Sequence, residues 1–314
     1  MMIQTQALIK RYNGQKQNAL KNLAFSVPQS SLYGLVGPDG AGKTTLLRIL
    51  AGVLPPTSGS VSIAGFKVGK EAARIRPLMG YMPQEFSQYP DLSLEENLDF
   101  FAQIQHVPRE KRAGRIRTLL EFTQLAPFAK RRAGKLSGGM KKKLALACAM
   151  VHEPRLLILD EPSTGVDPVS RRELWALLGQ VVQEGVTVLL STPYMDEAER
   201  CSQVSMLYEG QLLVSGAPSQ ITQALPFEIL EVKAKPRKLM RSVADETDGI
   251  LDWYPVGDSL RVATKGNGSQ GAIQQKLEAA YAATGAQVLS LRPARKTMED
   301  AFVYYLREEE APNG

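Results

Sequence analysis

One eight-residue motif constrains the fold of this chain more than any other feature. It is Gly37-Pro38-Asp39-Gly40-Ala41-Gly42-Lys43-Thr44, which fits the P-loop pattern G-x-x-x-x-G-K-[ST]. An apolar run, Leu32–Val36, reads as a buried strand in front of it, and a helical pattern begins at Thr45. A P-loop requires this order of strand, loop and helix, because its glycines turn backbone N–H groups towards one anion at a helix N-terminus. The motif therefore predicts a polyphosphate site, and the alternative is a glycine-rich turn that binds nothing. The predicted phosphate-binding residues are Gly37, Pro38, Asp39, Gly40, Ala41, Gly42, Lys43, Thr44 and Thr45.

Two carboxylates complement this motif. Lys43 is placed to reach the β and γ phosphates of a nucleotide, and the Thr44 hydroxyl is a Mg²⁺ ligand in such loops. The strongly apolar residues 156–159 predict an internal strand of a parallel sheet, which ends in Asp160 and Glu161. In a P-loop protein the first carboxylate holds Mg²⁺ through water, and the second orients or deprotonates the attacking water. The alternative is a solvated strand end.

A second small-residue loop lies far along the chain from the P-loop. Ser137, Gly138 and Gly139 precede an apolar helix that runs to about Val151. Small residues at a helix start leave free N–H groups for an anion, so the segment is a second candidate phosphate-binding element. A serine N-cap followed by flexible glycines is the alternative explanation.

Composition indicates an ordinary globular chain of 314 residues with 44% apolar and 22% charged residues. The net charge of +6 permits attraction to nucleic acid or anionic lipid, but we interpret the basic runs at 109–117, 130–135 and 141–143 as solvated helix faces. Two cysteines exclude a disulfide framework and fit a reducing compartment. Residues 144–151 are too short an apolar run to span a bilayer, so we expect a soluble chain.

The pattern of elements predicts two domains. Residues 1–225 form an α/β P-loop NTPase core with an antiparallel β layer near the start and a helical insertion at about 94–140. Residues 226–314 alternate short strands and helices, which predicts a small C-terminal α+β domain of the ferredoxin-like type. The predicted strands lie at 227–232, 259–263 and 286–291, and the predicted helices lie at 238–245, at 271–284 and from 297 onward. We find no catalytic constellation in the second domain.

The order of these motifs resembles the ATP-binding subunit of ABC transporters. The resemblance rests on the P-loop, on Gln84 after a strand, on the signature Leu136–Gly139 and on the strand ending at Glu161, and it covers residues 3 to about 225. Gly165-Val166-Asp167-Pro168 and the P-loop sequence are similar to the ABC-2 type exporters, and most of all to the first nucleotide-binding half of the YbhF-type multidrug efflux ATPases. The tail Met298–Phe302 is similar to the C-terminal extension of drug-resistance ATPases of this class.

The resemblance implies an ATPase that powers export of a drug or other amphiphile, with ATP and Mg²⁺ as cofactors. It implies that Tyr12 stacks on adenine, that Gln84 senses Mg²⁺ and the membrane partner, and that Glu161 is catalytic. Two such domains pair head to tail, so that Ser137, Gly138 and Gly139 of one cover the γ-phosphate bound by the other. The implied partners are integral membrane permease subunits and a second ABC ATPase domain, not nucleic acid. The implied location is peripheral, on the cytoplasmic face of the inner (plasma) membrane.

One position departs from the family pattern. The resemblance implies a histidine that contacts the γ-phosphate after the strand at 186–190, but Pro193 occupies that place. Proline supplies neither a side-chain donor nor a backbone N–H. We therefore expect this chain's own ATP site to turn over slowly or not at all, and its intact signature to complete the site of a different partner ATPase.

Two other functions compete with transport. A soluble ABC ATPase acting on nucleic acid or ribosomes is the main alternative, although translation-factor ATPases of that kind resemble tandem repeats, and this chain has a single P-loop and a single signature. A non-catalytic regulatory ABC subunit is the third, and Pro193 favours it.

Overall fold

The computed structural model describes residues 1–265 and 270–310 and separates into two compact units, Met1–Pro218 and Ser219–Gly314. The sequence-based boundary lies a few residues later, at 225/226. The difference concerns helix α8 (Pro218–Gln223), which groups with the second unit from its second residue onward. Leu225, just after this helix, is buried, and its carbonyl accepts a hydrogen bond from Lys296 of the second unit.

A six-stranded sheet forms the centre of the first unit. Its strands run parallel except β11, which pairs antiparallel with β10. Every residue of β4 and β8 is buried, as expected for strands covered on both faces. Because only β9 separates these two parallel strands, their carboxyl ends meet at one edge of the sheet, where ligands bind in such folds. In spatial order the strands are β11 (Gln211–Gly216), β10 (Gln203–Tyr208), β4 (Leu32–Val36), β9 (Thr187–Thr192), β8 (Leu156–Asp160) and β7 (Met79–Met82).

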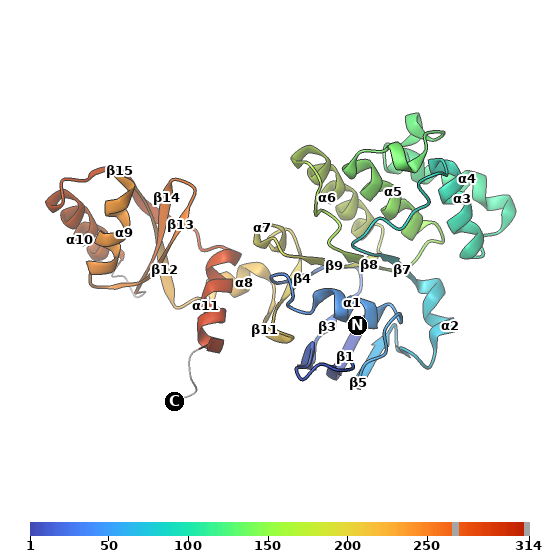
Figure 1. Ribbon diagram of the computed structural model, residues 1–314, viewed down its shortest axis with the longest axis horizontal. Helices are drawn as coiled ribbons and strands as arrows, with labels where there is room; N and C mark the ends of the chain where they lie inside the picture. The colour runs from blue at the N-terminus through green and yellow to red at the C-terminus, as the bar shows by residue number, and fades with distance from the viewer. Residues whose placement is uncertain (266–269, 311–314) are drawn as a thin grey trace. The chain divides into compact units, whose positions relative to one another are not determined.

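The predicted antiparallel β layer lies on one side of this sheet, with helix α1 (Lys43–Leu50) between the two sheets (Figure 1). Leu46, Leu47 and Leu50 of this helix are buried in a core shared by both sheets, which fixes the helix that follows the P-loop. The layer consists of β1 (Ile3–Lys10), β2 (Leu20–Leu23), β3 (Ser26–Val27), β5 (Ser58–Ile63) and β6 (Phe66–Lys67).

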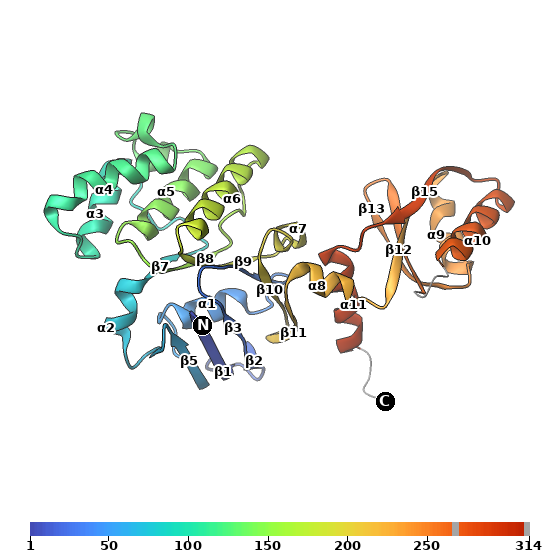
Figure 2. The same cartoon turned by 180° about the vertical axis from the view of Figure 1, so that it is seen from behind.

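Helices α3 to α6 lie on the other side of the six-stranded sheet (Figures 1 and 2). Helices α3 and α4 lie within the range 94–140, where the sequence analysis expects a helical insertion, and α3 begins at a reciprocal capping box formed by Ser93 and Glu96. Besides α1, the helices of the first unit are α2 (Ala72–Ile75), α3 (Leu94–Ile104), α4 (Arg109–Phe122), α5 (Gly138–Met150), α6 (Pro168–Gln183) and α7 (Met195–Ala198), and short 3₁₀ turns occur at Arg76–Leu78, Ala126–Phe128 and Ala133–Lys135.

The second unit has the element order and strand arrangement of a ferredoxin-like fold. Its antiparallel sheet runs β13-β14-β12-β15, with α9 and α10 on one face (Figure 2). The sequence analysis missed β13, because the strand is largely exposed or half-buried and contains Pro255. The elements are β12 (Phe227–Lys235), α9 (Arg237–Glu246), β13 (Ile250–Val256), β14 (Ser259–Lys265), α10 (Gln270–Ala283), β15 (Gln287–Ala294) and the final helix α11 (Met298–Glu310).

Across residues 1–265 and 270–310, no helix combines the length and the apolar character needed to cross a membrane.

Candidate functional site

Two glycines allow the P-loop backbone to adopt its conformation and to lie close to a neighbouring strand. A Cβ on Gly37 would lie 2.0 Å from the carbonyl oxygen of Leu207, so no side chain fits there. Gly42, the N-cap of α1, adopts a φ of 103°, which is a left-handed conformation that glycine accommodates at little cost. These constraints fix the loop directly in front of the first turn of α1, and a helix N-terminus is a favourable place for an anion.

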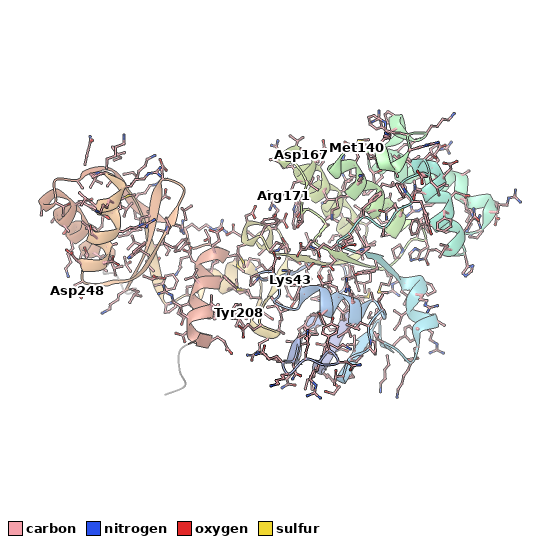
Figure 3. All side chains as sticks on the ribbon, viewed as in Figure 1. Lys43, Met140, Asp167, Arg171, Tyr208 and Asp248 are labelled. Carbon is pink, nitrogen blue, oxygen red and sulfur yellow. The ribbon has the colours of Figure 1, made fainter. Side chains whose placement is uncertain are left out.

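Lys43 is the buried cation of this loop (Figure 3). Its Nζ donates to the carbonyl oxygens of Gly37 and Pro38 at 2.7 and 2.9 Å and lies 3.6 Å from the Glu161 carboxylate. Burial lowers the pKa of this ammonium, while the charge of Glu161 opposes that shift.

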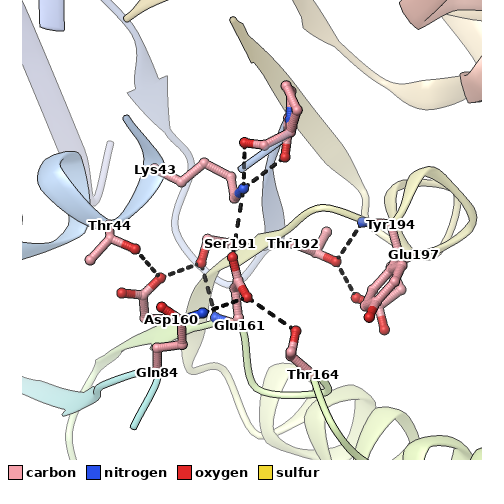
Figure 4. Close-up of polar contacts among 12 residues, drawn as sticks. Lys43, Thr44, Gln84, Asp160, Glu161, Thr164, Ser191, Thr192, Tyr194 and Glu197 are labelled. Carbon is pink, nitrogen blue, oxygen red and sulfur yellow. Dashed lines mark hydrogen bonds and ion pairs between the residues drawn. The ribbon is translucent and has the colours of Figure 1, made fainter. Parts of the chain in front are cut away.

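The first carboxylate after β8 joins the P-loop helix to β9. Asp160 is buried, and its Oδ1 accepts hydrogen bonds from the Thr44 hydroxyl at 3.1 Å and the Ser191 hydroxyl at 2.7 Å (Figure 4). Its Oδ2 is also buried but has no hydrogen-bond partner within the described ranges. A buried anionic oxygen beside a threonine hydroxyl is the kind of ligand set that Mg²⁺ prefers.

The second carboxylate, that of Glu161, lies between the Gln84 amide, the Thr164 hydroxyl and the Lys43 ammonium (Figure 4). Glu161 Oε2 accepts from the Gln84 side-chain amide at 2.9 Å and from the Thr164 hydroxyl at 3.1 Å. Its backbone is left-handed, with a φ of 47°, and its N–H donates to Ser191 Oγ at 2.9 Å. A left-handed conformation is rare for a glutamate and marks a position where the surrounding structure overrides local preference.

The structure thus brings Lys43, Thr44, Gln84, Asp160 and Glu161 together at the carboxyl ends of β4, β7 and β8. Sequence reasoning did not single out Ser191 or Thr164, which complete this hydrogen-bonded cluster. The signal that could have identified Ser191 is its position near the carboxyl end of β9, the strand that pairs with β8.

Our interpretation of residues 141–143 as a solvated helix face is wrong for two of the three lysines. Lys142 donates to the carbonyl oxygens of Gln84 and Glu161 at 3.0 and 3.1 Å, and Lys143 is buried against Glu173 of α6 at 2.7 Å. Consecutive helical residues point about 100° apart, so a charge run on a helix cannot all face solvent when neighbouring elements cover part of that helix.

The predicted adenine-stacking residue, Tyr12, is half-buried beside the P-loop helix. Its hydroxyl lies 3.1 Å from Thr45 Oγ1, and the Lys10 ammonium lies 5.4 Å from its ring centroid. Tyr12 therefore lies beside the first turn of the helix that follows the P-loop.

The signature residues form the start of α5 and are not part of the Lys43 cluster. Figure 3 shows Met140, which follows them directly, well away from Lys43. Ser137 caps the helix by accepting from the Met140 N–H at 3.3 Å. Gly138 is exposed, and a Cβ on Gly139 would lie 2.4 Å from Ser170 of α6, so this glycine is required by packing.

Pro193 lies just beyond β9, half-buried, between residues of a polar network. Thr192 donates to the fully buried Glu197, which also accepts from Arg171 at 2.7 Å. The Tyr194 N–H donates to Thr192 Oγ1 at 3.1 Å, so it is engaged within the segment.

Comparisons with known proteins agree with this architecture. The family described as ABC transporter matches residues 20–164. The probable multidrug ABC transporter ATP-binding protein YbhF of Escherichia coli K12 is 41% identical over 96% of this chain, which spans about half (51%) of that protein. The Nod factor export ATP-binding protein I of Burkholderia pseudomallei is 38% identical over 73% of this chain and 76% of that protein. This chain belongs to the ABC transporter ATP-binding family.

A solved structure supports the same assignment. The dimeric post-hydrolysis state of an ATP-binding cassette bound to ADP and Pi superposes with a TM-score of 0.64 at 25% identity, and the match covers 69% of this chain and 98% of that one. The predicted fold class, a P-loop NTPase of the ABC ATPase type, is therefore confirmed, as is the resemblance to YbhF and its relatives.

Proposed function

We propose that this chain is the ATP-binding and ATP-hydrolysing subunit of an ABC-2 type exporter for drugs or other amphiphiles. The convergence of Lys43, Thr44, Gln84, Asp160 and Glu161 at one edge of the sheet supports the ATPase activity. Similarity to a multidrug ATPase and to a Nod factor export protein supports the export class.

In this proposal ATP binds through the P-loop. Residues 37–45, which are the P-loop and the first turn of α1, receive the phosphates, although Pro38 has no N–H to contribute. Lys43 turns from the carbonyl oxygens of Gly37 and Pro38 to the β and γ phosphates. Tyr12, beside Thr45, is the proposed adenine platform.

The residues present fit a bound Mg²⁺. Thr44 Oγ1 and the buried Oδ2 of Asp160 are hard oxygen donors at one place, and the Gln84 side chain, which donates to the adjacent Glu161, carries a third such oxygen. Bound Mg²⁺ would neutralise charge on the β- and γ-phosphate oxygens.

Glu161 is the proposed catalytic residue. Its carboxylate is held by Gln84 and Thr164 and directed towards Lys43, so a water placed between Glu161 and the γ-phosphate would donate a proton to a fixed acceptor. The left-handed backbone of Glu161 keeps this orientation.

We infer a second ABC ATPase domain and integral membrane permease subunits as partners, which would hold the chain peripherally on the cytoplasmic face of the inner membrane. Exposed Ser137 and Gly138 leave the N-terminus of α5 accessible to nucleotide bound by a partner. We expect no nucleic-acid partner, because Lys142 and Lys143 make contacts inside the chain.

We further propose that this chain's own ATP site is slow and pairs with a different ATPase. Pro193 has no donor, and the N–H of the next residue, Tyr194, is engaged by Thr192. Loss of one transition-state donor costs on the order of a hundred- to a thousandfold in rate.

The test is Mg-ATP binding and steady-state hydrolysis by the purified chain, with Glu161→Gln and Pro193→His beside it. Tight binding, negligible turnover and a gain of turnover in Pro193→His would support the degenerate site. Turnover that rises with protein concentration and disappears in Glu161→Gln would support the ATPase but refute the asymmetry. Absence of ATP binding would refute the proposed function.

A further inference from the structure

Three consecutive lysines in the first two turns of α5 face different neighbours. Lys141 lies 5.3 Å from the ring centroid of Phe86, and Lys143 pairs with Glu173. The middle lysine, Lys142, reaches the functional site itself. A helix presents successive residues about 100° apart, so each lysine contacts a different part of the unit.

Lys142 joins two segments that are distant in sequence. Its half-buried ammonium donates to the backbone carbonyl of Gln84, just after β7, and to the backbone carbonyl of Glu161, just after β8. Both contacts are charge-assisted hydrogen bonds of 3.0 to 3.1 Å, roughly twice as strong as neutral ones. Burial lowers the pKa of Lys142, and the carboxylates of Glu161 and Asp160 oppose this shift.

The two carbonyl groups belong to the residues whose side chains meet in the site. The Gln84 amide donates to Glu161 Oε2 at 2.9 Å, so the two residues are linked once through their side chains and again through Lys142. The backbone of Glu161 also adopts a left-handed conformation, which needs support from outside its own segment. Lys142 provides part of that support at the carbonyl oxygen.

The same helix carries the signature at its first turn. Lys142 follows Ser137 by five residues, roughly 7 Å along the helix axis. Helix α5 is therefore a rigid connection between the signature and the backbone that orients Gln84 and Glu161.

We propose that Lys142 is a positioning residue for ATP hydrolysis, whose ammonium fixes the backbones of Gln84 and Glu161 to the signature helix. This inference rests on the proposed function, because it takes Glu161 as the catalytic carboxylate. Lys142 acts through the other two residues and does not itself touch the nucleotide.

The experiment uses the full chain with Lys142→Met, which keeps the unbranched apolar stem of the side chain but removes the ammonium donors, and Lys142→Arg, which keeps donors. Lys111→Met, at an exposed lysine of α4, is the matched control. Hydrogen exchange by mass spectrometry follows the segments 82–88 and 160–164, and single-turnover hydrolysis of Mg-ATP registers even a slow rate.

In Lys142→Met we expect exchange in both segments to rise about tenfold or more and the hydrolysis rate to fall about ten- to a hundredfold, as expected for losing charged hydrogen bonds. The dissociation constant for ATP should change by less than about threefold, because the P-loop is untouched. Lys142→Arg should retain most of the rate, and Lys111→Met should match the parent chain.

Two results would overturn the inference. One is exchange in Lys142→Met that equals that of Lys111→Met in both segments. The other is an equal loss of thermal stability and rate in Lys142→Met and Lys142→Arg, because lost packing alone would explain it.

Glu161→Gln, measured in parallel, separates this inference from the proposed function. If Glu161→Gln abolishes hydrolysis but Lys142→Met hydrolyses at the parent rate, the inference fails and the ATPase proposal stands. If Glu161→Gln hydrolyses normally, the proposed role of Glu161 fails, and the exchange data alone decide whether Lys142 holds the two segments.

Discussion

Substitution of Asp300 by asparagine should strongly destabilise the second unit. Asp300 is 2% exposed and accepts from the Tyr254 hydroxyl, from Arg261 Nη2 at 2.7 Å, and from the N–H and hydroxyl of Thr297 at 2.6 and 2.9 Å. This one carboxylate therefore fixes the start of α11 to β13 and β14.

The expected loss of stability follows from the charge of Arg261, which would remain buried without its partner. Asparagine would keep one acceptor but turn an NH₂ group towards donors, and it would leave the Arg261 guanidinium, with its side chain 11% exposed, without its ion-pair partner. Breaking a buried pair from one side costs about 3–5 kcal/mol. For a unit of this size, 3 kcal/mol corresponds to a fall in Tm of roughly 12–24 °C.

Fluorescence can follow this unit separately, because the chain has two tryptophans, Trp175 in the first unit and Trp253 in the second. In a Trp175→Phe background, thermal and urea unfolding then report on β13. Asp258→Asn is the matched control, because the Lys233–Asp258 pair is substantially exposed, and an exposed ion pair contributes little to stability. A loss in Asp300→Asn no larger than that of the control would refute the reasoning.

Three further outcomes are expected. Gly37→Ala should weaken ATP binding about tenfold or more in an equilibrium binding assay, because the new Cβ cannot lie 2.0 Å from the Leu207 carbonyl oxygen without displacing the loop; unchanged affinity would contradict this. Burial opposes ionisation of Asp300, but its bonds from Arg261 and Tyr254 dominate and lower its pKa. Its stabilising effect should be complete above the unfolded-state pKa of about 3.9 and be lost as pH falls below it, so urea midpoints should fall more steeply with acid in the parent chain than in Asp300→Asn. Burial raises the pKa of Cys148, and it raises that of Cys201 to about 12, so a thiol reagent at pH 8 should label both cysteines only after unfolding.

Local sequence pattern was sufficient to predict most elements of the first unit. Hydrophobic periodicity is a local signal, which is why the strand at Leu156–Asp160 and the helix at Leu94–Ile104 appear where the pattern places them. Strand β13 escaped prediction because an exposed strand with a proline has neither a buried pattern nor a regular alternation.

The sequence by itself also determined the types and order of the residues in the candidate site, since Lys43, Thr44, Asp160 and Glu161 belong to motifs whose spacing is fixed by a strand and the loop after it. Only the tertiary structure brings these residues close together in space. Thr44 and Asp160 are 116 residues apart, and the parallel pairing of β4, β9 and β8 brings them within 3.1 Å. The same pairing supplied Ser191, and packing of α5 against β7 turned Lys142 from an expected surface lysine into a contact of the site. A residue's neighbours across a sheet depend on strand order and register, which no local pattern in the chain specifies.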